Sequence, residues 1–387
     1  MGRGRIATRM ERVPASGIRR FFDIAAQMPD VISLGIGEPD FVTPDPIRAA
    51  GIRSIEDGHT AYTSNSGMAS LRMALAGHLT RLYGVGYDAD DELLITVGVS
   101  EALQNVMLAL IDPGDEVIVP EPCFVAYQAC VIFAGGVPVP VATTAADGFA
   151  VPLAALEAAI TPRTRAIMIG YPNNPTGAVM ERAALQQLVD LAARHDLLVI
   201  SDEIYDRLVY GVTHTCVAAL AGARERTVLL GGFSKAYAMT GWRLGWLAAP
   251  ADIVAATRKI HQYAIMSAPT PAQYAGLAAL EDGEDAVQQM VAEYDRRRRV
   301  VVNGLNQIGL PTVEPRGAFY AFPRVDQLGL ASEAFAEQLL HAQHVAVIPG
   351  DVFGPSGAGH VRVCYAASLD RLEAALDRID RFVRTIH

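Results

Sequence analysis

The sequence lacks an excess of positive charge and lacks any long apolar run. Across 387 residues, 42 acidic side chains outnumber 32 basic ones, which gives a formal net charge of -10. A dedicated nucleic-acid binder carries a basic patch or stripe, so this balance argues against that class of protein. No apolar run approaches the roughly 18 residues that a membrane-spanning helix requires. We therefore expect no nucleic-acid partner, no membrane contact and a cytoplasmic location.

Cysteine is also scarce. The four cysteines form no CxxC pair and no Cys/His spacing typical of a metal site, so we expect small buried apolar side chains and no bound metal. Hydrophobic residues make up 51% of the chain and charged residues 19%, a composition that excludes disorder and supports a large core. At roughly 100 to 200 residues per domain, this length predicts two domains.

Short apolar segments alternate with helix-length segments between about residues 67 and 250. The expected strands are 93–98, 115–120, 136–141, 164–170, 197–203, 227–232 and 245–249. The expected helices are 67–84, 100–111, 124–134, 152–160 and 181–196. This alternation predicts an α/β fold, a three-layer α/β/α large domain around a mostly parallel seven-stranded sheet. Ligands of such sheets bind beyond the carboxyl ends of the strands.

The remaining residues predict a smaller α+β domain. Residues 250–310 are largely helical, and strands are expected at 318–323, 345–349 and 360–366. We assign residues 46–285 to the large domain, and residues 1–45, as an N-terminal arm, with 286–387 to the small domain. The run Arg296–Arg299 is expected to form a solvated helix face or a packing edge.

Three loops that follow expected strands carry polar residues in apolar surroundings. In Tyr171–Gly177, the Asn-Pro and Thr-Gly pairs are typical of ordinary turns. In Ser201–Tyr205, an acid at a strand end could cap a helix, bind a metal or pair with a cationic ligand. In Gly232–Gly245, a lysine and an arginine lie eight residues apart among glycines and aromatics. Desolvation and a neighbouring cation lower the pKa of such a lysine and make it a usable amine nucleophile.

The order and spacing of these residues are specific. Asn174, Asp202, Tyr205, Lys235 and Arg243 together resemble the pyridoxal-phosphate enzymes of fold type I. The string G-F-S-K-x-x-A-M-x-G-x-R-L-G is similar to the lysine signature of class I aminotransferases. The segments SLGIGEPDF, YTSNSG, DPGDEV, NNPTG and GAFYAFP resemble the gamma subgroup of that class. The resemblance covers essentially the whole chain.

This resemblance assigns residues to the ring of pyridoxal 5'-phosphate. Lys235 is expected to form a Schiff base with the cofactor aldehyde and then to move the proton between Cα of the substrate and C4' of the cofactor. Asp202 is expected to face the pyridine nitrogen and keep it protonated. Asn174 and Tyr205 are expected to hydrogen-bond the phenolic oxygen. Phe124 falls where the family stacks an aromatic ring, here without a polar handle.

The resemblance also assigns the phosphate site. The N–H groups of Val99 and Ser100, at a strand-to-helix turn, provide an anion site, and Arg243 adds a cationic fork. Tyr62 matches a tyrosine that reaches the phosphate from the neighbouring subunit, so the resemblance implies a homodimer. Gly232 stands where many relatives have a serine, which removes one hydroxyl contact to the phosphate.

For the substrate, the resemblance implies that Arg362 grips the α-carboxylate as a fork, with Asn174 and the backbone of Gly37 beside it. Relatives that prefer dicarboxylates carry a second arginine at a position that falls here on Tyr263. The N-terminal segment with Arg19 and Arg20 could still supply a distal cation.

The resemblance therefore implies an aminotransferase that moves the amino group of an aromatic or broad range of L-amino acids to 2-oxoglutarate by a ping-pong mechanism. An aspartate-preferring enzyme is the alternative, because Arg19 and Arg20 stay available. A C–S β-lyase or a decarboxylase would use the same fold and lysine. A transcription regulator would need a DNA-binding module ahead of Gly35, and about 34 residues are too few for one.

Overall fold

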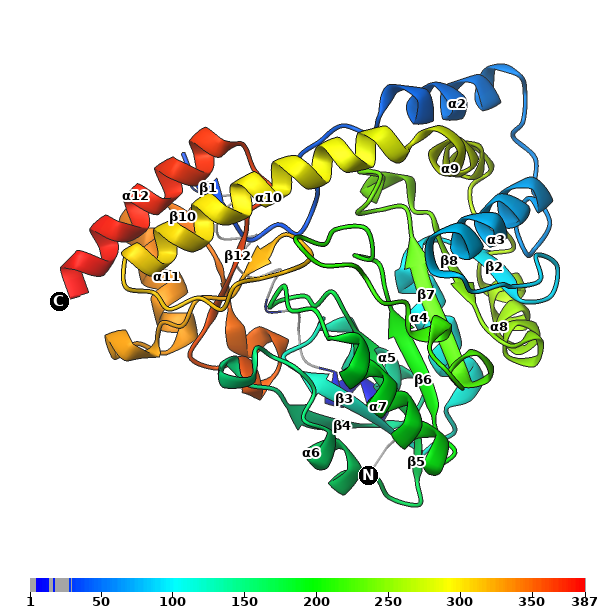
Figure 1. Ribbon diagram of the computed structural model, residues 1–387, viewed down its shortest axis with the longest axis horizontal. Coiled ribbons are helices and arrows are strands. Elements are labelled where there is room, and N and C mark those ends of the chain that lie inside the picture. The colour runs from blue at the N-terminus through cyan, green and yellow to red at the C-terminus, as the bar shows by residue number, and fades with distance from the viewer. Residues whose placement is uncertain (1–4, 14–16, 18–27, 29, 387) are drawn as a thin grey trace.

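A seven-stranded sheet forms the centre of the computed structural model, which describes residues 5–13, 17, 28 and 30–386 (Figure 1). The strand order is β2–β8–β7–β6–β5–β3–β4. The strands are β2 (Leu93–Thr96), β3 (Glu116–Glu121), β4 (Val137–Ala142), β5 (Thr164–Gly170), β6 (Leu198–Asp202), β7 (Thr227–Gly232) and β8 (Gly245–Ala248). β8 runs antiparallel to both neighbours, whereas the pairings among β3 to β7 are parallel. The predicted mostly parallel seven-stranded sheet is confirmed.

Both faces of this sheet are buried, as its nearly continuous apolar strands require. Successive side chains of a strand point to opposite faces. In β5, Ala166 and Met168 pack with helices of one face, and Ile167 and Ile169 pack with helices of the other. The first face carries α4 (Gly98–Leu110), α5 (Ala126–Phe133) and α8 (Ala251–Ala264). The second carries α3 (Ala69–Tyr83), α6 (Leu153–Ala158), α7 (Arg182–Arg194) and α9 (Thr270–Asp282), with α2 (Asp45–Glu56) against α9. The three-layer α/β/α prediction is therefore confirmed.

The chain beyond α9 adds three long helices and a separate small sheet. Its helices are α10 (Glu284–Gln307), α11 (Ser332–Gln343) and α12 (Leu369–Ile386), and α10 runs from the side of α9 to α12 (Figure 1). Its antiparallel sheet has the order β11–β12–β9, from Ile348–Pro349, Val361–Cys364 and Tyr320–Ala321. Short 3-10 helices complete the described elements: η1 (Thr8–Arg12), η2 (Ala145–Asp147), η3 (Val217–Ala219), η4 (Arg224–Arg226), η5 (Thr240–Trp242), η6 (Asp326–Leu328), η7 (Gly350–Phe353) and η8 (Pro355–Gly357).

The predicted strand 345–349 is divided in two. β10 (Val345–Ala346) pairs in parallel with β1 (Ile32–Ser33), whereas β11 pairs with β12. The two halves have different partners, so the strand breaks at Val347. The division of the chain near residue 285 stays a prediction, and that position lies in the first turn of α10.

The arginine run in α10 was predicted to form a solvated helix face or a packing edge. Arg296 and Arg299 are exposed and pair with acids of their own helix. Arg297 and Arg298 are only 6% and 8% exposed. Arg297 pairs with Asp40 at 2.7 Å, so α10 holds the segment that follows β1. A solvated face is therefore wrong for the two middle arginines, which form a packing edge.

All four cysteines are buried and unbonded, which confirms their expected place in the core. Among the described residues, no helix is long and apolar enough to cross a membrane. Within the same residues, no group of three or more His, Cys, Asp or Glu side chains is placed to hold a metal ion.

Candidate active site

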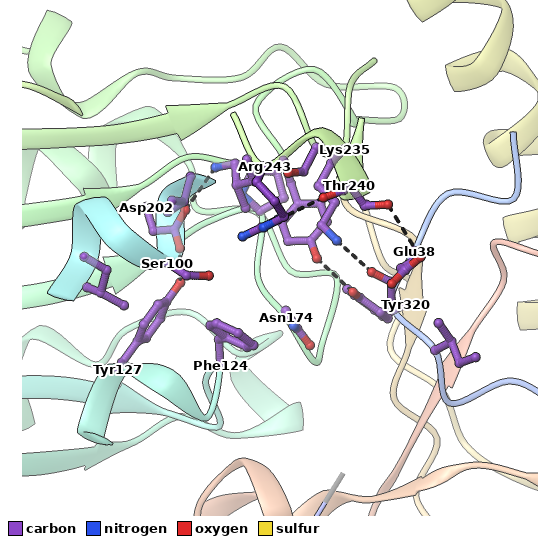
Figure 2. Close-up of a pocket in the computed structure, with 18 of the residues that line it drawn as sticks. Glu38, Ser100, Phe124, Tyr127, Asn174, Asp202, Lys235, Thr240, Arg243 and Tyr320 are labelled. Carbon is purple, nitrogen blue, oxygen red and sulfur yellow. Dashed lines mark hydrogen bonds between the residues drawn. The ribbon is translucent and has the colours of Figure 1, made fainter. Parts of the chain in front are cut away.

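The carboxyl ends of three neighbouring parallel strands open onto one cavity. β5 ends at Gly170, β6 at Asp202 and β7 at Gly232, and the loops that follow carry the polar residues singled out from the sequence. The cavity has a volume of about 570 Å³, within the range of small-molecule sites (Figure 2). Ten of the predicted site residues line it: Gly37, Val99, Ser100, Phe124, Asn174, Asp202, Tyr205, Lys235, Arg243 and Arg362.

Lys235 reaches this cavity from the loop after β7. Its Nζ donates a hydrogen bond to the carbonyl oxygen of Gly37 at 2.7 Å. Burial lowers the pKa of Lys235 to about 8. The neighbouring Cys364 and Glu38 side chains oppose this fall in the pKa, whereas the cations Arg362 and Arg243 add to it. A lysine with this pKa is partly neutral near pH 7, so its amine is available as a nucleophile.

Asp202, the last residue of β6, lines the cavity. Its side chain accepts a hydrogen bond from the Tyr127 hydroxyl at 2.9 Å and another from the Ile204 N–H at 3.1 Å. Burial raises the pKa of Asp202 to about 6, and these two hydrogen bonds limit the rise. A buried carboxylate is stabilised by a cationic partner. Asp202 is therefore suited to a ligand that presents a protonated nitrogen.

Tyr127 is a site residue that the sequence reasoning missed. It lies in α5, three residues after Phe124, and the two rings meet edge to face at 5.8 Å between centroids. Gly170 leaves room for its hydroxyl, because a Cβ at that position would come within 2.1 Å of the Tyr127 oxygen. The available signal was its place three residues after Phe124 in the helix expected over 124–134. Tyr127 thus supports both the carboxylate and the aromatic side chain of the site.

Arg362 is buried in β12, with 3% of its surface exposed. Its Nη1 donates to Oδ1 of Asn174 at 2.8 Å, and its Nη2 donates to the carbonyl oxygen of Gly35 at 2.5 Å. The guanidinium lies over the rings of Tyr320 and Phe353, 4.5 and 4.9 Å from their centroids. A planar guanidinium held this firmly suits two-point binding of a carboxylate.

An anion site lies at the start of α4. Val99 and Ser100 are in the first turn of this helix, where backbone N–H groups are unpaired and the helix dipole is positive. The Arg243 guanidinium lies directly over Gly98, since a Cβ there would be 2.6 Å from Nη2 of Arg243. A helix start beside a guanidinium is a suitable site for a phosphate.

Tyr62 does not line the cavity of its own chain. Its side chain is 79% exposed. The loop that carries it is tied to the residues after α8 by hydrogen bonds from Asn65 to the Met266 carbonyl, at 2.8 Å, and from Thr270 to the Ala61 carbonyl, at 2.7 Å. The role expected for Tyr62 in a neighbouring subunit stays a prediction.

No described residue expected to supply a distal cation brings positive charge to the cavity. Tyr263, at the end of α8, is 89% exposed and supplies no positive charge. Arg19 and Arg20 lie outside the described residues. Glu38 and Thr240, which the sequence reasoning also missed, line the cavity and bring one negative and one neutral polar side chain to it (Figure 2).

These residues fit pyridoxal 5'-phosphate. A side chain at Gly98 would collide with the Arg243 guanidinium. Glycine therefore allows the guanidinium to lie beside the start of α4, where a phosphate could bind. Asp202 suits a protonated ring nitrogen, Phe124 offers an aromatic face, and the Lys235 amine suits an aldehyde. Fold and site together define a pyridoxal-phosphate-dependent transferase of fold type I.

Comparison with known proteins defines the family. The model for aminotransferase class I and II matches residues 29–379, and the chain belongs to this family. An aspartate aminotransferase of Pyrococcus abyssi is 44% identical over 382 residues, which cover 98% of each chain. Aromatic-amino-acid aminotransferase 2 of Thermococcus litoralis is 42% identical over 382 residues, with the same coverage. The structure of Thermus thermophilus aspartate aminotransferase with maleate matches with a TM-score of 0.94 at 38% identity, over 98% of this chain and 100% of that chain. The predicted fold type and enzyme class are thereby confirmed.

Proposed function

We propose that this aminotransferase moves the amino group of an aromatic or broad range of L-amino acids to 2-oxoglutarate in a ping-pong sequence. The observation that carries the proposal is a single cavity lined by an amine of lowered pKa, a buried carboxylate and a carboxylate-binding arginine: Lys235, Asp202 and Arg362. These three groups are what amino transfer needs, because the substrate must be held, its Cα deprotonated and the resulting charge withdrawn.

The cofactor, when bound, would supply an aldehyde for an amine and an aromatic ring that withdraws electrons from the substrate Cα. Asp202 would hold the proton on the ring nitrogen. The Asn174 amide and the Tyr205 hydroxyl would donate to the phenolic oxygen, and Phe124 would stack on the ring. The Arg362 hydrogen bond to Oδ1 of Asn174 orients that amide so that its NH2 group is the end left to donate.

Lys235 would act first as the amine that holds the aldehyde and then as the base. As the base, its Nζ would move the proton between the substrate Cα and C4' of the cofactor. Arg362, Asn174 and the backbone of Gly37 would hold the α-carboxylate during this transfer. A lowered lysine pKa favours both steps, because each begins from a neutral amine.

Arg243 and the α4 start would bind the cofactor phosphate. We expect Arg243→Ala to weaken cofactor affinity about 10- to 100-fold, since a charge-assisted hydrogen bond contributes about 1.5–3 kcal/mol. Equilibrium dialysis of the cofactor against the purified protein measures this. Arg324→Ala is the matched control, because Arg324 pairs with Asp326 on the surface away from the cavity. Equal affinity in the Arg243 variant and the control would contradict the phosphate assignment.

Substrate preference can be measured directly. We expect kcat/KM with 2-oxoglutarate as acceptor to be higher for Phe and Tyr than for Asp. Tyr263 stands where dicarboxylate-preferring relatives carry the second arginine, and Glu38 adds a negative charge to the cavity lining. Ala and Lys complete the series. A hundredfold preference for Asp over Phe would contradict the aromatic assignment and favour an aspartate-preferring enzyme. That alternative is supported by relatives named aspartate aminotransferases.

Tyr62 would complete the phosphate site of a second copy in a homodimer. We expect light scattering to give about twice the 41.3 kDa of one chain. Tyr62→Phe should weaken cofactor affinity about tenfold, since it removes one hydrogen bond to a charged group. Tyr274→Phe serves as control, because Tyr274 stacks on His59 and does not line the cavity. A monomer at working concentration, or an unchanged affinity in Tyr62→Phe, would contradict this part of the proposal.

A further inference from the structure

Tyr320 connects the part of the site expected to hold the cofactor ring with the part expected to hold the substrate carboxylate. It lies in β9 with 1% of its surface exposed, and it lines the cavity. Its hydroxyl oxygen is 2.8 Å from that of Tyr205. The Arg362 guanidinium lies over the Tyr320 ring, with its Cζ atom 4.5 Å from the ring centroid. One side chain therefore contacts both the residue expected at the cofactor ring and the arginine expected at the substrate carboxylate.

The surrounding backbone is shaped around the Tyr320 hydroxyl. A Cβ at Gly37 would come within 2.3 Å of the Tyr320 oxygen, so glycine is needed at that position for the hydroxyl to lie where it does. The carbonyl of the same glycine accepts the hydrogen bond from Lys235. The Tyr320 hydroxyl thus lies between Tyr205 and the backbone that contacts the lysine.

The direction of the hydrogen bond between the two tyrosines follows from the proposed function, on which this inference rests. Each hydroxyl has one hydrogen to donate. If Tyr205 donates its hydrogen to the phenolic oxygen of the cofactor, its own oxygen can only accept. The hydrogen between the two tyrosines must then come from Tyr320.

We propose that Tyr320 is a positioning residue that couples the substrate-carboxylate site to the cofactor ring. Its hydroxyl donates to Tyr205, which strengthens the hydrogen bond that Tyr205 donates in turn, because consecutive hydrogen bonds polarise one another. Its ring supports the Arg362 guanidinium through a cation–π contact. The two functions belong to different atoms of one side chain, so different substitutions separate them.

Tyr320→Phe tests the hydroxyl. With pyridoxal 5'-phosphate bound, the protein should have a visible absorption band that changes with pH. The midpoint of this pH titration reports how strongly the phenolic oxygen is stabilised as an anion. We expect the midpoint to rise by about half to one pH unit in Tyr320→Phe, the effect of one ordinary hydrogen bond. The value of kcat should fall about 5- to 20-fold, whereas KM for the amino acid should stay within about threefold, because the ring beneath Arg362 remains.

A double variant tests whether Tyr320 acts through Tyr205. Tyr205→Phe alone should raise the midpoint further than Tyr320→Phe does. Adding Tyr320→Phe to Tyr205→Phe should then change the midpoint by less than about 0.2 units, because the hydrogen bond that it removes is already absent. Additive shifts would overturn the proposal.

Tyr320→Leu tests the ring and gives a second variant for the same residue. Removing the cation–π contact should raise KM for the amino acid about 3- to 30-fold. The matched control for the hydroxyl substitution, Tyr320→Phe, is Tyr210→Phe. Tyr210 is a buried tyrosine that also lies beneath an arginine, with Arg298 at 5.4 Å, and its hydroxyl bonds the carbonyl of Ala318 rather than a site residue. Its midpoint and KM should match those of the unmodified protein.

The outcomes separate this inference from the function on which it rests. If the unmodified protein forms no visible band with pyridoxal 5'-phosphate, the proposed function fails. If the band forms and shifts in Tyr205→Phe, yet Tyr320→Phe titrates like the Tyr210→Phe control, the function stands and the role of Tyr320 is wrong. An unchanged KM in Tyr320→Leu would likewise overturn the coupling to Arg362.

Discussion

Lys235→Ala is expected to lose the visible absorption band of the loaded protein and to lower kcat by at least about 10⁴-fold. The loss combines two roles, since Lys235 would be both the amine that holds the cofactor aldehyde and the base at the substrate Cα. No other lysine is placed to replace it, because the chain has two lysines and the second, Lys259, is an exposed residue of α8. Spectra and steady-state rates of the purified variant measure both effects.

Lys259→Ala is the matched control for this experiment. It removes the same functional group from the surface and should leave the band and kcat unchanged. Exogenous small amines should partly restore the rate of Lys235→Ala, because a free amine can serve as the base, and they should not alter Lys259→Ala. Wild-type turnover in Lys235→Ala would refute the assignment of Lys235.

Asp202→Asn is expected to lower kcat by about 10³-fold while cofactor remains bound. The amide keeps the volume of the side chain. Its oxygen can still accept from the Ile204 N–H, and its NH2 group can donate to the Tyr127 hydroxyl, so the substitution removes mainly the charge that would hold the ring nitrogen protonated. Removing one preorganised electrostatic partner of a transition state costs on the order of 10²- to 10³-fold. Asp206→Asn is the control, because Asp206 is a carboxylate four residues further on that accepts from Tyr83 and does not line the cavity. Equal losses in the two variants would contradict the role of Asp202.

The same substitution should stabilise the cofactor-free protein. The pKa of Asp202 is raised to about 6 in the folded chain by burial. An acid with a raised pKa costs stability above that pKa, where it is ionised in both states, and the cost disappears as the pH falls through its folded and then its unfolded pKa. Asp202→Asn should therefore have a higher Tm than the unmodified apoprotein at pH 8, with the difference shrinking toward pH 4. Lower activity together with a higher Tm in Asp202→Asn would show that the Asp202 charge serves function and does not stabilise the fold.

The layered fold could be predicted from the sequence because its signal is local. Each of the seven strands is a short apolar run, and a sheet covered on both faces requires such runs. The split between β10 and β11 could not be predicted, since it depends on which partner strand each half meets. The burial of Arg297 has the same origin, because its partner Asp40 is distant in the sequence and the composition of α10 alone resembles a solvated face.

The site residues that could be predicted are polar groups in or beside apolar strands, at positions that match the motifs of the resembled family. Lys235, Asp202, Asn174, Arg243 and Arg362 all meet at the cavity. Tyr127 and Tyr320 were missed because tyrosine in an apolar segment is usually a core residue, and neither contacts the cavity through a charge. Their importance lies in the hydroxyl contacts to Asp202 and Tyr205, which depend on glycines at positions 170 and 37 in other parts of the chain.

Borohydride reduction followed by peptide mapping tests the central claim most directly. Reduction converts a carbon–nitrogen double bond between cofactor and lysine into a stable single bond, and mass spectrometry then locates the label. With two lysines in the chain, the map has one site and one internal control. We predict that the reduced cofactor lies on the peptide containing Lys235, and that adding an amino acid before reduction removes the label. A label on Lys259, or a label that amino acid does not displace, would contradict the account.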